Sequence, residues 1–334
     1  MRRLIALALV VILAPGQALA WGNTGHRILG VAAARALPAE VPAFLRTRQA
    51  IADVGELSRE PDRSKAAGRV HDQDRDPGHF SDLHEDGTVL LGPPMLPLAT
   101  TRADYEASLQ AHKLNSWSAG YLPYTIIDRW QQLLIDFAYW RVLEAAENNR
   151  AWRTNQAWFQ ADRRRREALI LRDIGELSHM VGDGSQPLHV TTHFNGWGEY
   201  PNPAGYSMAR SFHGVFEGDV VRDSVRPKAV EAGVAPLRLC GCSIEQRTAD
   251  YLMASNRLVV PLYELEKAGG LAKGDPRGAA FATRQMSAGA SELRDMIVEA
   301  WRASLDHRVG WRPIAVRDVL SGQVDPYASL RGVD

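Results

Sequence analysis

The chain contains very little cysteine. Its 334 residues include only Cys240 and Cys242, which flank a single glycine. This scarcity argues against a zinc site built from thiolates, because such a site would lack a second pair of ligands. A disulfide between the two would close a very tight ring and would be strained. The sequence leaves two ordinary thiols and one strained bridge as alternatives.

The chain also lacks an excess of either charge, internal repeats and low-complexity tracts. It has 39 basic and 39 acidic residues. Loss of residues 1–20 would remove Arg2 and Arg3, so 37 basic minus 39 acidic residues gives −2. This balance excludes a general basic field for binding duplex DNA.

The N-terminus has the features of a secretory signal peptide. A short basic start precedes an apolar run from Leu4 to Leu13, and Ala18-Leu19-Ala20 resembles a cleavage site. The run is too short to span a bilayer, so no transmembrane segment is expected. Cleavage after Ala20 predicts a secreted or periplasmic protein whose first residue is Trp21.

Apolar periodicity predicts a mainly helical chain. Helices are expected over residues 25–36, 128–148, 246–267 and 279–305, and turn-forming residues predict loops over 63–101 and 196–211. The basic run 163–166 is interpreted as a solvated helix face. The 314 residues left after cleavage (334 − 20) suit one large domain, residues 21–312, with a small C-terminal tail, residues 313–334.

Two groups of metal-competent residues lie in the second half of the chain. His179, Asp183 and His189 follow an H-x3-D-x5-H spacing. Four residues separate His179 from Asp183, so both side chains leave the same helix face, and Gly184 and Pro187 are expected to break the helix before His189. His213 and Glu217 repeat the spacing of four residues. Imidazole and carboxylate together suit zinc.

A third candidate group lies at the predicted mature N-terminus. Cleavage would give Trp21 a free α-amino group, which has a near-neutral pKa and binds metal once deprotonated. The amine and the Trp21 carbonyl could chelate one ion. His26 follows five residues later, at the start of a predicted helix.

These motifs together resemble the trinuclear-zinc superfamily of S1/P1-type nucleases and bacterial zinc-dependent phospholipases C. The resemblance rests on W-G-x3-H from Trp21, on H-x3-D-x5-H with Gln-Pro-Leu before its last histidine, and on H-x3-E, and it runs from Trp21 to about Glu217. Segment 179–189 is closer to the nuclease branch. The resemblance implies a single zinc-dependent phospholipase C/nuclease-like helical domain.

It also implies three zinc ions per chain and nine ligand residues. One ion would be held by Trp21, His26 and Asp183. Asp183 would bridge to a second ion that is completed by His179, an aspartate and a histidine from the segment before residue 85. The third ion would be held by the three downstream residues His189, His213 and Glu217.

The aspartate and histidine before residue 85 have alternatives. His79 lies in an H-F-x-D context that the family often uses, and Asp62 precedes it by the expected separation. Asp53 and His71 form an alternative pair, and His84 is a more remote candidate. We favour Asp62 and His79.

The implied activity is hydrolysis of phosphoester bonds, since bound zinc activates water. Asp62 and Asp183 are the candidate catalytic residues: Asp62 would orient the attacking hydroxide and Asp183 would bridge two ions. Phe80 and Trp197, with Tyr200, could stack an unpaired base or pack within loops. Asp82 is a further candidate for substrate contact.

Three functions compete at this stage. The first is an endonuclease, with 3'-nucleotidase activity as an extension, that acts as a monomer on single-stranded DNA or RNA without a stable protein partner. The second is a zinc-dependent phospholipase C, which Glu217 and the His193-Phe194-Asn195 loop favour because the nuclease branch usually has Asp and a G-G-N loop there. In the third, the zinc ions have a purely structural role. Open coordination positions argue against this role.

Overall fold

The computed structural model describes residues 21–332, so the predicted signal peptide lies outside the described residues. The described chain is mainly helical, which confirms that part of the prediction. Its α-helices are α1 (Gly22–Arg35), α2 (Arg48–Leu57), α3 (Glu60–Arg63), α4 (Arg69–Arg75), α5 (Arg102–Ala111), α6 (Ser116–Ala119), α7 (Leu122–Asn148), α8 (Gln156–Ser185), α9 (Phe212–Gly214), α10 (Val221–Ser224), α11 (Pro227–Ala232), α12 (Ile244–Asn256), α13 (Val259–Lys267), α14 (Pro276–Ala303), α15 (Val316–Leu320) and α16 (Tyr327–Arg331).

Short turns of other helix types and one small sheet complete the fold. The 3-10 turns are η1 (Ala43–Arg46), η2 (Asp76–His79), η3 (Arg150–Asn155), η4 (Pro187–His189) and η6 (Ser304–Asp306), and η5 (Val215–Val220) is a π-helix. Strands β1 (Arg308–Val309) and β2 (Ile314–Ala315) pair antiparallel. None of the described helices is both long and apolar enough to cross a membrane.

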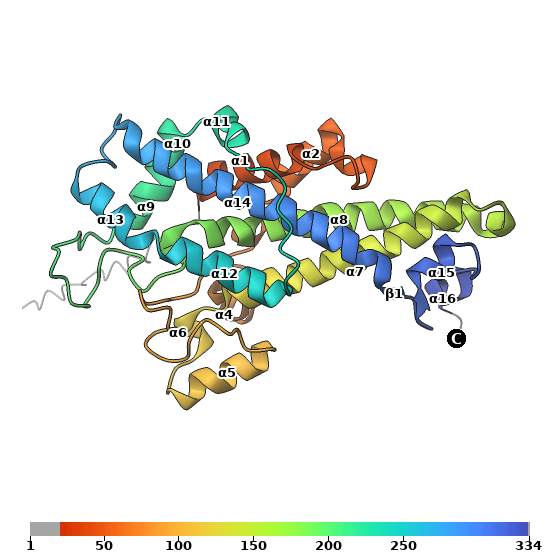
Figure 1. Ribbon diagram of the computed structural model, residues 1–334, viewed down its shortest axis with the longest axis horizontal. Helices are drawn as coiled ribbons and strands as arrows, with labels where there is room; N and C mark the ends of the chain where they lie inside the picture. Colours follow the sequence, from red (N-terminus) through yellow and green to blue (C-terminus); the bar gives the residue numbers. More distant parts are fainter. Residues whose placement is uncertain (1–20, 333–334) are drawn as a thin grey trace, which may run out of the picture.

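A long hairpin of α7 and α8 forms the frame of the molecule (Figure 1). Helix α14 packs across both arms, and α1 fits between α2, α8 and α14. Leu29 of α1, Leu177 of α8 and Leu293 of α14 are fully buried in the same apolar cluster. This packing places the C-terminal turns of α8 inside the protein, with α1 alongside them.

Local sequence signals explain where several elements begin and end. Helix α7 begins at Leu122, earlier than predicted, because Pro123 suits a first helical turn. The predicted helix over residues 246–267 is two helices, α12 and α13. The expected break before His189 is confirmed, since α8 ends at Ser185, one residue after Gly184, and η4 begins at Pro187. A Cβ at Gly184 would meet Tyr251 and Leu252 at 2.8 Å, so this glycine permits close helix packing.

The predicted loop over 63–101 and the predicted C-terminal tail both contain short helices. The predicted loop over 63–101 contains α4 and η2. The C-terminal segment adds β2, α15 and α16, and its Val316 and Val319 share a buried cluster with Val142 of α7 and Phe159 of α8. Cys240 and Cys242 are joined in a disulfide.

Candidate metal centre

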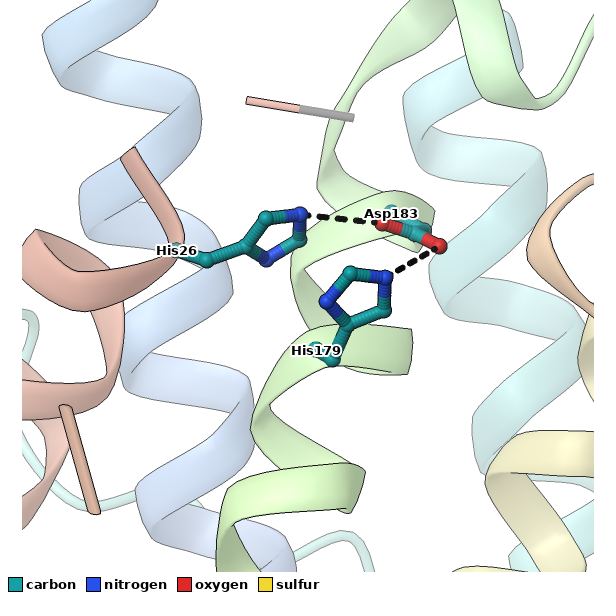
Figure 2. Close-up of side chains that lie close together, drawn as sticks. All are labelled: His26, His179 and Asp183. Atoms are coloured by element: carbon teal, nitrogen blue, oxygen red, sulfur yellow. Dashed lines mark ion pairs between the residues drawn. The ribbon is translucent and has the colours of Figure 1, made fainter. Parts of the chain in front are cut away.

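The first group of candidate ligands joins α1 to the end of α8. His179 and Asp183 lie one turn apart on α8, and His26 reaches them from α1; all three are fully buried. Asp183 Oδ1 is 3.4 Å from His26 Nε2, and its Oδ2 is 3.5 Å from His179 Nε2 (Figure 2). A Cβ at Gly182 would lie 2.9 Å from His26 Nδ1, so only glycine leaves room for that ring.

The second group brings in the segment before residue 85. His79, the last residue of η2, places Nδ1 3.0 Å from Asp183 Oδ2 and 3.1 Å from His179 Nε2. Asp62 of α3 lies with its Oδ1 3.7 Å from His179 Nε2. His179 Nδ1 is 2.8 Å from the Ser58 carbonyl, to which its N–H donates, so its Nε2 keeps a free lone pair facing the group.

The alternative residues lie outside these groups. Asp53 accepts a hydrogen bond from Gln49 on the exposed face of α2. His71 pairs with its neighbour Asp72 at 3.0 Å. His84 packs edge-on against Tyr200, with ring centroids 5.0 Å apart. The geometry therefore brings Asp62 and His79 to the candidate centre in place of Asp53 and His71.

The third group lies beside the second. His189 ends η4 and donates from Nδ1 to the His79 carbonyl at 2.8 Å. Glu217 Oε2 is 2.9 Å from His213 Nε2 and 3.8 Å from His189 Nε2. Gln186, in the turn after α8, donates weakly to the same oxygen at 3.5 Å. Glu217 lies in the π-helix η5, a helix type that is rare and often marks functional sites.

Many polar atoms in these groups are buried without a hydrogen-bond partner. They are both ring nitrogens of His26, Nδ1 of His213, Oδ2 of Asp62, Asp183 Oδ1 and His189 Nε2. Unpaired buried atoms of this kind are costly and rare. In each group the ligand atoms lie within 4.8 Å of one another. The three groups could therefore each hold a metal ion, which would satisfy these lone pairs.

The electrostatics of the groups agree with metal binding. Burial lowers the pKa of His26, His79 and His189, and it lowers the pKa of His179 to about 3. These rings are therefore neutral, which is the form that binds metal. Burial, and then the charge of Asp62, raise the pKa of Asp183 well above its usual range. A bound cation would compensate this buried carboxylate.

Glu217 is ionised even without a bound cation. Burial opposes its charge, but His213 and His189 together lower its pKa to about 2. The third group therefore already holds a carboxylate next to two imidazoles. This donor set suits zinc or a similar divalent ion.

Trp21 packs against the turn of α8 that carries Asp183. Its indole N–H donates to the Gly182 carbonyl and the Ser185 hydroxyl, each at 2.8 Å, and its side chain is fully buried. A Cβ at Gly25 would lie 2.6 Å from the Trp21 Cβ, so a larger residue there would displace the indole. The free amine of Trp21 stays a prediction.

A cavity of about 380 Å³ opens onto the second and third groups. His79, His189 and His213 form part of its wall. A larger cavity of about 1060 Å³ reaches the groups only at His79. The smaller cavity is therefore the candidate site for a substrate.

Four further residues of the smaller cavity were not singled out from the sequence: Lys65, Asp76, Trp117 and Ser118. Lys65 places Nζ 2.6 Å from Asp62 Oδ1 and is itself nearly buried. Its position three residues after Asp62 could have identified it, because that spacing gives one helix face. Trp117 adds apolar surface to the rim, and no local pattern marks it. Phe194 and Asn195, from the loop that the sequence set against the G-G-N loop of the nuclease branch, also line the cavity.

The predicted substrate residues lie in different environments. Phe80 and Asp82 line the cavity, and burial raises the pKa of Asp82 well above its usual range. Of the two alternatives for Trp197, the structure favours packing within its loop, since Trp197 is 6 % exposed and stacks on His193 with ring centroids 3.8 Å apart. Trp197 packs within its loop because its indole N–H donates to the Pro201 carbonyl.

Comparison with known proteins adds no assignment: no family model matches the chain, and no curated protein does.

Proposed function

We propose that this chain is a secreted or periplasmic phosphodiesterase that uses three zinc ions to hydrolyse single-stranded nucleic acids, with the helical domain of the S1/P1-type nuclease and zinc-dependent phospholipase C superfamily. One observation carries the proposal: three buried groups of imidazole and carboxylate ligands adjoin each other, two of them on one small cavity. A single structural zinc would need only one such group.

Each ion would be held by side chains from several elements. His26 and Asp183, with the amine and carbonyl of Trp21 after cleavage, would hold the first. Asp183, Asp62, His79 and His179 would hold the second, which is a set of nitrogen and oxygen donors typical of zinc. The third would be held by His189, His213 and Glu217. When bound, zinc supplies an activated water at neutral pH and a positive charge for the phosphoryl oxygens.

The surrounding side chains would orient the reactants. Asp62 accepts a hydrogen bond from the attacking water and so directs it toward phosphorus. The Lys65 ammonium, 2.6 Å from Asp62, lines the cavity and adds a positive charge where a phosphate would enter. Phosphoryl transfer depends mainly on such positioning and charge.

The shape of the cavity favours an unpaired nucleotide. Its volume of about 380 Å³ is far too small for a duplex but suits one base and its sugar. Phe80 and Phe194 supply aromatic surface for stacking, which every base permits. The buried Asp82 carboxyl, whose pKa burial raises, lines the cavity and would contact a base edge.

A phospholipase C activity is the second candidate. Glu217 favours it, and so does the apolar rim of the cavity, where Trp117 is 53 % exposed and Phe194 is 40 % exposed. Such a rim would contact a lipid surface as readily as a nucleobase. A purely structural role for the metal would predict no hydrolysis at all.

Two measurements test the proposal. Elemental analysis of protein purified with its leader removed should give about three zinc ions per chain, and one or none would contradict it. An activity panel with single-stranded DNA, single-stranded RNA, duplex DNA and a phosphatidylcholine analogue should show hydrolysis of the single strands, abolished by a chelator and restored by zinc. Cleavage of the lipid analogue alone would favour the phospholipase.

A further inference from the structure

Two chain segments run side by side to form one wall of the cavity. The Ser81 N–H donates to the His189 carbonyl at 2.9 Å, and the Thr192 N–H donates to the Leu83 carbonyl at 3.0 Å. Neither contact uses a side chain. Phe80 and Asp82 on the first segment, and Phe194 and Asn195 just after the second, line the cavity, so the pairing of the segments fixes where these side chains lie.

An ion pair joins the outer ends of these segments. Glu85 follows Asp82 by three residues, and His193 directly precedes Phe194 and Asn195. His193 Nε2 lies 2.6 Å from Glu85 Oε1. The pair therefore links the two groups of residues that would contact a substrate from opposite segments.

Both ring nitrogens of His193 face hydrogen-bond acceptors. Its Nε2 faces the Glu85 carboxylate, and its Nδ1 lies 2.7 Å from the Trp197 carbonyl. Both partners are acceptors, but a neutral imidazole offers only one donor. The ring is 2 % exposed and stacks at an interplanar angle of 8° on the Trp197 indole, whose face stabilises a cation.

The other charged or titratable groups around His193 do not replace Glu85. His84 lies near enough to feel its charge, and burial lowers the pKa of His84. Tyr200 contacts the imidazole edge-on at 5.0 Å, and the Tyr263 hydroxyl of α13 donates to the His193 carbonyl at 2.6 Å. The nearby Asp86 carboxylate accepts from Thr88. Within residues 21–332, Glu85 is the one ion-pair partner of His193.

We propose that His193 and Glu85 form a clamp that positions the walls of the cavity for substrate. This inference rests on the proposed function for its substrate, while the clamp itself is a property of the two loops. The pair holds Phe194 and Asn195 against the segment of Asp82 without touching the candidate metal ligands. Its loss should weaken substrate binding and leave the chemical step intact.

The test compares Glu85→Gln with a control, Glu199→Gln. Glu199 is an exposed carboxylate on the same loop and forms no ion pair with any described residue. In the zinc-loaded wild type, ¹⁵N NMR should show both His193 ring nitrogens protonated at neutral pH. Glu85→Gln should leave one protonated. It should also raise KM for a single-stranded oligonucleotide about tenfold, with kcat and zinc content unchanged, since charged hydrogen bonds are stronger than neutral ones. The control should match the wild type in every measurement.

The outcomes separate the clamp from the proposed function. A neutral His193 in the wild type overturns the clamp whatever the substrate is, and so does an unchanged KM or a fall in kcat with loss of zinc in Glu85→Gln. If no oligonucleotide is hydrolysed by the wild type, the proposed function fails. The NMR comparison and hydrogen exchange of residues 193–197, which should be faster in Glu85→Gln, then decide the clamp alone.

Discussion

Asp183→Asn is the most informative perturbation of the candidate centre. Asp183 belongs to the first group and contacts the second through His79 and His179. Asparagine keeps the shape of the side chain and removes the charge that would hold two cations together. We expect zinc content to fall from about three to about one per chain, since the group around Glu217 does not include Asp183.

The variant should lose activity, and its effect on stability should differ in sign with and without zinc. Loss of the charged ligand should lower kcat by about 10³-fold, or on the order of 4 kcal/mol of transition-state stabilisation. In zinc at 100 times its dissociation constant, each lost ion removes about 2.7 kcal/mol of stability. In metal-free protein the variant should be more stable, by on the order of 1–3 kcal/mol, because burial raises the pKa of the Asp183 carboxyl and its ionisation costs stability that a neutral amide avoids.

Elemental analysis, phosphodiesterase assays and urea unfolding with and without zinc measure these three effects. His84→Ala is the control, because His84 lies outside the metal groups, and it should keep its zinc. The ligand assignment would be wrong if Asp183→Asn kept wild-type zinc and turnover while His84→Ala lost both. Equal unfolding free energies of the two metal-free proteins would refute the electrostatic argument.

Three further predictions follow from the same geometry. Residues added before Trp21 should lower zinc content and nearly abolish activity, and a fully active extended protein would exclude the amine as a ligand. Asp62→Asn should lose zinc and activity, whereas Asp53→Asn, on an exposed helix face, should change neither in the same assays. The pKa of Asp173 is raised to about 9 by burial first, and then by a hydrogen bond to Asp136 and the charge of Asp136. Its ionisation therefore costs stability as pH rises from about 4 to 9. Asp173→Asn should therefore unfold like the wild type at pH 4 and at a higher temperature at pH 8, and calorimetry showing no such pH-dependent gain would contradict this.

Helix periodicity explains what could be predicted from the sequence. The spacing of His179 and Asp183 on α8 fixes a common face, because four residues nearly complete a turn. The apolar pattern likewise predicts long helices, and α7 and α14 extend over the expected ranges with shifted ends. Gly184 lies where α8 was expected to end, and it also has a packing role that local rules do not show, because Tyr251 and Leu252 leave no space for a side chain.

Contacts between distant segments explain what could not be predicted. Trp197 follows a glycine in a polar loop, and only the folded chain shows that it stacks on His193. Lys65 and Trp117 come together at one cavity from separate segments. Neither apolar periodicity nor the spacing of ligands along the chain specifies which residues of distant loops come into contact.

The choice between Asp62/His79 and Asp53/His71 depends on two backbone carbonyls. Ser58 accepts from Nδ1 of His179, and the His79 carbonyl accepts from Nδ1 of His189. Each hydrogen bond fixes a tautomer, so that Nε2 is left to bind metal, and each also ties the segment of residues 58–79 to the end of α8. His179 and His189 therefore hold in place the segment of residues 58–79, which carries Asp62 and His79, and the same segment orients the two imidazoles. Because one interaction sets both the protonation of a ligand and the position of its neighbours, the ligand set becomes unique only in the folded protein.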